Sequence, residues 1–198
     1  MSFKSSAFEH DTGIDLKING ATVLNIAEGG ITRTGADYSW SQEILGDNFA
    51  IAGGGAIAQA VLSIGSFRKY NAWQFPNGAT DPYIDINFWL PPGYDGSALK
   101  ATLYWVKTAT ATGTAIVTNC RLVCIGTGDS LDSTVSTGVD VTTTVGSNNC
   151  LFITEHTVTP NNAADGGLCH GLIQRKPTNV ADDYTGSTYL IGVRMEYA

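Results

Sequence analysis

Apolar and polar side chains alternate with a period of two along several stretches of this chain, and this pattern limits the fold more than any other feature. The alternation is clearest over residues 83–90, 98–107 and 188–197. In the first stretch, Ile84 and Phe88 fall on one side of an extended chain and polar residues fall on the other. Successive side chains of a strand point to opposite faces, so the pattern predicts strands that each bury one face.

Residues typical of turns interrupt these stretches. Pro76-Asn77-Gly78, Pro91-Pro92-Gly93 and Asp165-Gly166-Gly167 supply the Pro, Asn, Asp and Gly that turns need. We therefore predict strands near residues 67–75, 83–90, 98–107, 114–125, 138–145, 150–159, 168–176 and 188–197. Eight strands separated by such turn residues predict an all-β fold, an eight-stranded antiparallel jelly-roll sandwich.

The composition agrees with an all-β chain of ordinary domain size. Glycine contributes 23 of the 198 residues, and both glycine and the abundant β-branched residues destabilise helices. Only 15% of the residues are charged, against about 25% in an average soluble protein. A surface with few charges also indicates that other chains cover part of it.

The charge balance argues against a nucleic-acid partner. The formal net charge is −7, and the adjacent basic pairs Arg68-Lys69 and Arg175-Lys176 do not make the basic patch that phosphate contacts need. Residues 1–15 lack the apolar run of a signal peptide. The longest mostly apolar stretch, residues 49–64, is interrupted by Gly53-Gly54-Gly55 and is too short to span a membrane. We expect neither nucleic acid nor a membrane as a partner.

The first 65 residues differ from the rest and are expected to serve attachment and oligomerisation, followed by the sandwich over residues 66–198. A polar arm precedes a predicted hairpin, in which Asn19-Gly20 suits a type I′ turn and residues 23–26 return. Residues 31–46 look irregular, and residues 56–64 fit a short helix or a strand. The candidate partner-binding residues are Phe3, Phe8, Ile14, Leu16 and Ile18.

Four cysteines occur, and we interpret all of them as reduced thiols that act as small apolar residues. They are Cys120, Cys124, Cys150 and Cys169. Cys120 and Cys124 lie four apart in a predicted strand, where their Cα atoms are too far apart to be bridged. Pairing between cysteines on distant strands stays open.

Motifs that carry chemistry are weak. Gly128-Asp129-Ser130-Leu131 matches the short signature of GDSL esterases, but no Asp lies three residues before His156 or His170 to complete a triad. We therefore interpret the motif as a polar turn between strands. Cys120 and Cys124 have the spacing of one pair of zinc ligands, but they lie inside an apolar strand and no second close pair follows. We therefore expect no metal and no cofactor.

Two further groups are candidates for binding. The acidic pairs Asp129/Asp132 and Asp182/Asp183 suit turns better than glycoside hydrolysis, with a calcium ion at Asp129/Asp132 as the alternative. Trp73, Trp89 and Trp105 recur every sixteen residues. They are expected in the core or on a sheet face, and an exposed row of them would stack on sugar rings.

Residues 66–198 resemble a jelly-roll domain of tailed-phage structural proteins. The resemblance lies in residues 73–78, 88–96 and 101–105, and in the ending from Arg175 to Tyr197 with Asp182-Asp183-Tyr184 before the last strand. Residues 19–26 resemble the small hairpins that begin trimeric phage fibre and head proteins. The resemblance implies a non-enzymatic virion protein, usually a homotrimer, and carries over no catalytic residue.

These observations lead us to expect a homotrimeric capsid decoration, or cement, protein. It would be made in the host cytoplasm, sit on the outer surface of the phage head and contact sister copies and the major capsid protein. The alternative is a receptor-binding or carbohydrate-binding tip of a tail or head fibre, with a host-surface glycan as partner. The third hypothesis is an enzyme on the virion, either a lyase or an esterase.

Overall fold

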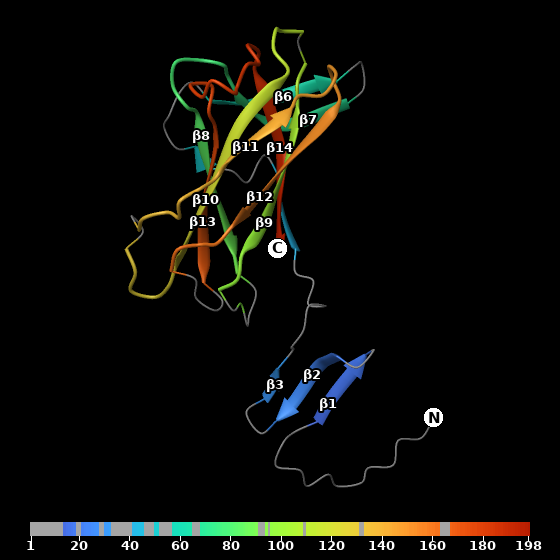
Figure 1. Cartoon of the computed structure of the whole chain (residues 1–198), viewed down its shortest axis with the longest axis vertical. Helices are drawn as coiled ribbons and strands as arrows, with labels where there is room; N and C mark the ends of the chain where they lie inside the picture. The colour runs from blue at the N-terminus through green and yellow to red at the C-terminus, as the bar shows by residue number, and fades with distance from the viewer. Residues whose placement is uncertain are drawn as a thin grey trace. The chain divides into compact units, whose positions relative to one another are not determined.

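The computed structural model (Figure 1) describes residues 14–18, 21–27, 30–32, 41–45, 50–51, 57–64, 68–90, 94, 96–108, 110–130, 133–162 and 167–198. The chain divides into two units, Met1–Trp40 and Ser41–Ala198. Every regular element among the described residues is a strand, and none of these residues belongs to a helix that could cross a membrane.

The first unit contains a small antiparallel sheet in the order β1-β2-β3. Its strands are β1 (Ile14–Ile18), β2 (Ala21–Ala27) and β3 (Gly30–Thr32). The predicted hairpin is thereby confirmed, and β3 is an addition to it. Residues 1–13 and Asn19-Gly20 lie outside the described residues, so the expected arm with Phe3 and Phe8 stays a prediction.

The second unit is a sandwich of two antiparallel sheets, which confirms the predicted all-β architecture. The five-stranded sheet has the order β11-β10-β13-β8-β5, and the six-stranded sheet has the order β12-β9-β14-β7-β6 with β4 paired to β14. The strands are β4 (Ser41–Leu45), β5 (Ala50–Ile51), β6 (Ala58–Ile64), β7 (Arg68–Phe75), β8 (Tyr83–Trp89), β9 (Leu99–Val106), β10 (Ala115–Ile125), β11 (Asp140–Thr144), β12 (Leu151–Val158), β13 (Leu168–Arg175) and β14 (Thr188–Tyr197).

The eight strands predicted between residues 67 and 197 match β7 to β14. The structure corrects the reading of the preceding segment, because β4 and β6 extend the six-stranded sheet and β5 extends the other. β4 and β5 were not predicted because they are short, and β6 settles the choice between helix and strand that the apolar run of residues 56–64 left open. Residues 41–64 therefore contribute strands to the sandwich, although the sequence grouped them with the first region.

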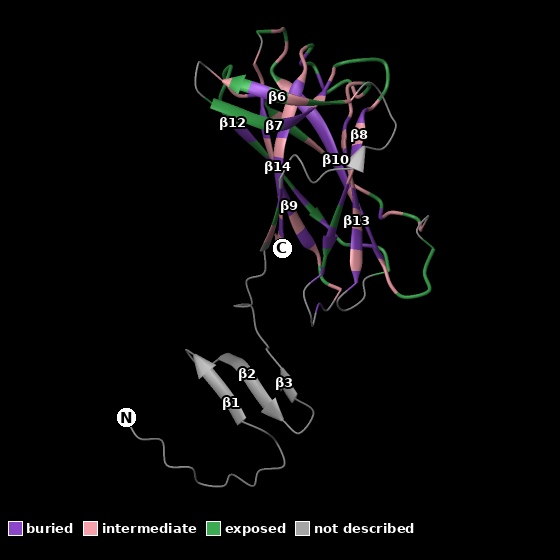
Figure 2. Cartoon of the chain, turned by 180° about the vertical axis from the view of Figure 1, so that it is seen from behind, coloured by how far each residue is buried: buried purple, intermediate pink, exposed green. Residues whose placement is uncertain are grey.

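The core lies between the sheets and is built from the alternating apolar residues. Burial alternates along the strands, as the bands of buried and half-buried residues along β13 show in Figure 2. Every second residue of β12 is buried as well. Phe75 and Trp105, both fully buried, meet edge to face with ring centroids 5.1 Å apart. Offset or edge-to-face aromatic pairs of this kind stabilise a core beyond the area they bury.

A buried guanidinium ties the end of β13 to its surroundings. Arg175 donates to Asp182 through Nε (3.0 Å) and Nη2 (2.7 Å). Its remaining N–H groups reach the carbonyls of Tyr184 (2.5 Å), Gly186 (2.7 Å) and Phe75 (3.3 Å). All five guanidinium donors are thus satisfied, which is the condition for burying this charge at tolerable cost.

His156 provides a test of core electrostatics. Its side chain is 2% exposed, its Nε2 lies 2.9 Å from the hydroxyl of Thr118 across the sandwich, and burial lowers its pKa to about 4. Because the unfolded chain binds the proton at a higher pH than the folded chain does, the free energy of unfolding has its full value above about pH 6.5. It falls by on the order of 2–3 kcal/mol as the pH drops from about 6.5 to 4. Urea unfolding of the wild type and His156→Gln at pH 7.5 and 5 measures this loss. An equal loss of unfolding free energy in both proteins would contradict the role assigned to His156.

Candidate ligand-binding face

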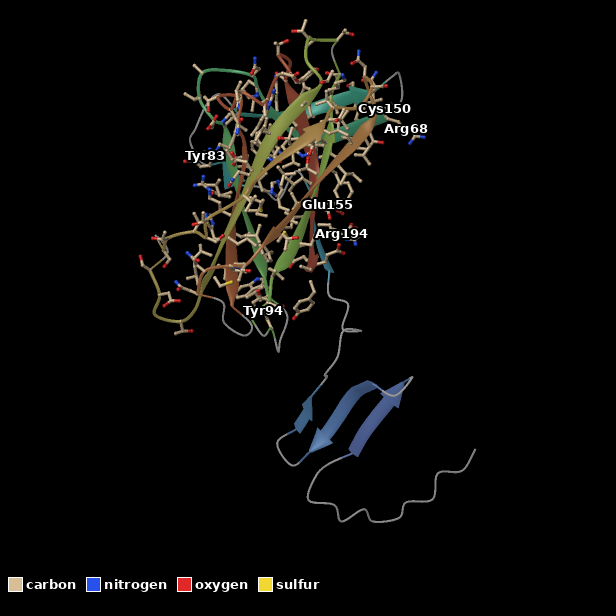
Figure 3. The ribbon with its side chains drawn as sticks, viewed as in Figure 1. Arg68, Tyr83, Tyr94, Cys150, Glu155 and Arg194 are labelled. Atoms are coloured by element: carbon tan, nitrogen blue, oxygen red, sulfur yellow. The ribbon has the colours of Figure 1, made fainter. Side chains whose placement is uncertain are left out.

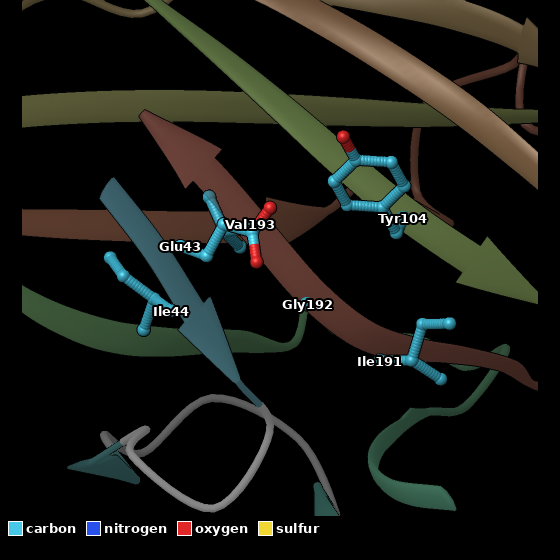
Figure 4. Close-up of a pocket in the computed structure, with 6 residues that line it drawn as sticks. All are labelled: Glu43, Ile44, Tyr104, Ile191, Gly192 and Val193. Atoms are coloured by element: carbon cyan, nitrogen blue, oxygen red, sulfur yellow. The ribbon is translucent and has the colours of Figure 1, made fainter. Parts of the chain in front are cut away.

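A hollow of about 180 Å³ opens on the outer face of the six-stranded sheet (Figure 4). Three adjacent strands form it: β9 supplies Tyr104, β14 supplies the floor, and β4 supplies the far wall. The lining residues are Glu43, Ile44, Tyr104, Ile191, Gly192 and Val193. We call the outward side chains of β12, β9, β14 and β4 around this hollow the Tyr104 face.

The hollow arises at an irregularity in β14. The register shifts between Leu190 and Gly192, so Gly192 comes opposite Tyr104 on one side and Leu45 on the other. Gly192 lies two residues before the outward-facing Arg194, and any side chain at this position would project into the hollow. Bulges re-aim side chains and are frequent beside binding sites.

Charged groups border the hollow along the next rows of the sheet. Arg194 lies between Thr102 of β9 and Glu43 of β4 in the register. Its Nε donates to Glu196 Oε2 at 2.9 Å, and Lys100 Nζ lies 2.8 Å from Glu196 Oε1. Lys100 also reaches Glu155 of β12 at 3.3 Å, and Figure 3 labels Glu155 and Arg194 on these strands.

These bonds favour the charged forms of all three groups. Hydrogen bonds from Lys100 and Arg194 lower the pKa of Glu196, and hydrogen bonds to Glu196 raise the pKa of both cations. Exposed ion pairs of this kind add little stability. Their consequence is geometric, because they hold donors and acceptors in place beside Tyr104.

The opposite end of the face is apolar. Leu151 and Ile153 of β12 are 52% and 45% exposed, and Ile153 lies opposite Tyr104 in the register. Beyond Tyr104, Tyr189 and Ile191 pack against a small buried cluster outside the main core. The face therefore changes from apolar to charged across the hollow, and it can receive a ligand with both apolar and hydroxyl surfaces.

The described part of the GDSL-like segment, residues 128–130, lies in a turn that begins at Gly126, as the sequence suggests. The Asp129 carboxylate accepts from the backbone N–H of Gly126 (2.8 Å), and Ser133 Oγ donates to the Ser130 carbonyl (2.6 Å). Asp132 lies outside the described residues, so the calcium alternative at Asp129/Asp132 stays untested. Among the described residues, no group of three His, Cys, Asp or Glu side chains forms a metal cluster.

The other acidic pair has a structural role. Asp182 binds the buried Arg175, and Asp183 Oδ1 accepts from the backbone N–H groups of Thr114 and Ala115, each at 2.7 Å. These backbone hydrogen bonds lower the pKa of Asp183.

The three tryptophans do not form an exposed row. Trp73 and Trp105 are buried at 3% and 0%, whereas Trp89 is 62% exposed at the end of β8 on the outer face of the five-stranded sheet. Two positions along β8 from it, Asn87 Oδ1 lies 3.1 Å from His170 Nδ1, and His170 Nε2 lies 3.1 Å from Asp85 Oδ1. Desolvation raises the pKa of Asp85, with His170 acting in the opposite direction.

The candidate partner-binding residues divide between described and undescribed parts of the chain. Ile14, Leu16 and Ile18 lie on β1 and pair in register with Ile26, Leu24 and Ala21 of β2. Phe3 and Phe8 lie outside the described residues. These three residues belong to the first unit, whereas the Tyr104 face belongs to the second. Their role stays a prediction.

The sequence did not single out Tyr104, Glu43, Gly192 or Arg194. A glycine within the otherwise alternating pattern of residues 188–197 was the available signal, since glycine inside a strand often marks a bulge or a close approach.

No family model and no curated protein matches this chain. Among solved structures, it is similar to the C-terminal CBM6 of the laminarinase LamC from Zobellia galactanivorans, with 11% identity, a TM-score of 0.44, and coverage of 78% of this chain and 98% of that one. The CBM22-1 xylan-binding domain of Paenibacillus barcinonensis Xyn10C gives 9% identity and a TM-score of 0.41, covering 79% and 92%. The enzymatically active domain of tailspike protein 4 from bacteriophage CBA120 gives 7% and 0.39, covering 82% of this chain and 20% of that one. These likenesses concern architecture.

Proposed function

We propose that the protein binds carbohydrate through the Tyr104 face. The observation that carries this proposal is the hollow, which Tyr104 of β9 and Glu43 of β4 line from the two strands that flank Gly192 of β14. Sugar rings have apolar C–H faces and hydroxyl edges. An aromatic ring packs against the former, and carboxylate and guanidinium groups bond to the latter.

The size of the hollow suggests how the ligand lies. Its volume of about 180 Å³ is below the roughly 300–1,000 Å³ of pockets that enclose drug-sized ligands. It suits a single sugar ring, with the rest of a chain lying across the open face toward Ile153 or Arg194. The ion pairs of Arg194 and Lys100 with Glu196 would orient the polar groups before binding, which reduces the entropy lost on association.

We infer further that the protein binds without catalysis. The Ser130 turn is held by local bonds, and Asp182 and Asp183 are engaged in structural hydrogen bonds. The placement of the protein on a phage head, its trimeric state and its contact with a capsid protein stay proposals that rest on the sequence resemblance.

Truncating the aromatic side chain tests the proposed site. Screening the wild-type chain on a glycan array identifies an oligosaccharide, and calorimetric titration then compares it with Tyr104→Ala. We expect about 10–30-fold weaker binding, because a central aromatic contact is removed. Trp89→Ala, which removes an exposed aromatic residue from the other sheet, is the matched control and should bind like the wild type. Loss of binding in Trp89→Ala with none in Tyr104→Ala would place the site on the five-stranded sheet and refute the proposal.

A further inference from the structure

Two of the four cysteines face each other across neighbouring strands of the five-stranded sheet. Cys124 of β10 and Cys169 of β13 are direct partners in the antiparallel register, and both are 0% exposed. Their side chains are in hydrogen-bond contact. The sequence places these residues far apart, so only the register reveals the pair.

The backbone hydrogen bonds show which kind of antiparallel pair this is. The Cys124 N–H donates to the Asn161 carbonyl at 2.8 Å, away from β13. Two residues earlier, the Leu122 N–H bonds to Ser136 Oγ (3.0 Å), and the Leu122 carbonyl accepts from the Ser136 N–H (2.8 Å). Residues of this parity in β10 therefore direct their backbone groups away from β13, and Cys124 and Cys169 form a non-hydrogen-bonded pair.

That arrangement suits a covalent bond. In a non-hydrogen-bonded antiparallel pair the Cα atoms lie about 4.5 Å apart and the side chains approach most closely. Disulfides span Cα separations of about 4.4–6.8 Å. The pair can thus be bridged without moving the strands.

We propose that Cys124 and Cys169 are a redox site that closes into a cross-strand disulfide when the chain folds in the presence of a small-molecule disulfide. One cysteine thiolate attacks the small disulfide, releasing one small thiol and forming a mixed disulfide. The second cysteine thiolate then displaces the other small thiol. In balance, two cysteine thiols are oxidised to one S–S bond, and one small disulfide is reduced to two thiols, with two protons passing from the cysteines to the released thiolates.

Timing follows from burial. The contact with Cys124, together with desolvation, raises the pKa of Cys169, and a buried thiol that stays protonated is a poor nucleophile. The exchange therefore takes place while the chain folds, and a protein folded under reducing conditions keeps its dithiol when an oxidant is added later.

The other two cysteines provide internal controls. Cys120 lies opposite Ile173 in the same pair of strands, and Cys150 is exposed after β11. Because Cys150 can cross-link copies of the chain, the experiment uses the full chain with Cys150→Ala. One sample is refolded with a mixture of oxidised and reduced glutathione, and the other with dithiothreitol. Both are then alkylated in denaturant and digested for peptide mapping without reduction.

We expect the oxidised sample to contain one cross-linked peptide pair joining Cys124 to Cys169, with Cys120 alkylated. Its Tm should exceed that of the reduced sample by roughly 10 °C, since the bridge closes a long loop. Adding Cys169→Ala should abolish the cross-link. Should Cys124 and Cys169 both be alkylated after oxidative refolding, or should Cys120 take the place of either, the proposal is overturned, and this readout does not depend on the folding of any Cys124 or Cys169 variant.

Discussion

Arg175→Met should lower the free energy of unfolding by about 3–5 kcal/mol, because it leaves the buried carboxylate of Asp182 without its counter-ion. Both side chains of this ion pair are 0% exposed. Methionine fills much of the same space but also removes the hydrogen bonds that Arg175 donates to the carbonyls of Phe75, Tyr184 and Gly186. Urea unfolding at pH 7 measures the change.

Two further variants separate charge from shape. Arg175→Lys keeps the charge but lacks the planar five-donor geometry, so it should still be clearly destabilised. Arg121→Lys is the matched control, because Arg121 is half-buried on an outer face and bonds to Asn119 Oδ1 at 3.0 Å. A similar midpoint for Arg175→Lys and Arg121→Lys would contradict the role assigned to Arg175.

Gly113→Ala should be destabilised by about 3 kcal/mol, combining backbone strain with a steric clash. Gly113 has φ +90°, and a Cβ atom placed there would lie 1.9 Å from the carbonyl oxygen of Asp183. The loop before β10 therefore packs backbone to backbone against residues 183–184, where the Asp183 side chain also bonds to Thr114 and Ala115.

Matched glycines separate the two causes. Gly128 has a similar φ of +92° but no atom within 4 Å of an added Cβ, whereas Gly78 has neither a positive φ nor such a contact. Thermal unfolding should rank the alanine variants by their free energy of unfolding. Gly78→Ala should have the wild-type value, Gly128→Ala a value lower by about 1 kcal/mol through backbone strain alone, and Gly113→Ala the lowest value. If Gly113→Ala unfolds like Gly128→Ala, the close packing of this loop is refuted.

The sequence predicts the strands of the sandwich where one face of the strand is buried and the other is exposed. The regular alternation in β8 and the pleated burial of β12 follow directly from a sheet with one face in the core. β4 was not predictable and β6 was predicted only as a helix or a strand, because each depends on pairing with a partner strand: β4 pairs with β14 and β6 with β7.

The Tyr104 face could not be predicted from the sequence for a related reason. Tyr104, Gly192 and Glu43 come from three strands that are far apart in the sequence, and the register shift in β14 brings them together. Arg175 was visible only as half of a basic pair, although its surroundings bury it completely. Local patterns report the period of a strand, whereas the position of a residue across a sheet depends on the topology.

An NMR titration shows whether an oligosaccharide binds to the Tyr104 face. Amide resonances of the isotopically labelled chain are followed during titration with the oligosaccharide selected on the glycan array. We predict that the largest shifts occur at Tyr104, Ile191, Gly192 and Arg194, with residues around Trp89 and His170 unaffected. Shifts confined to the Trp89 region, or the absence of any retained glycan on the array, would contradict carbohydrate binding by the Tyr104 face.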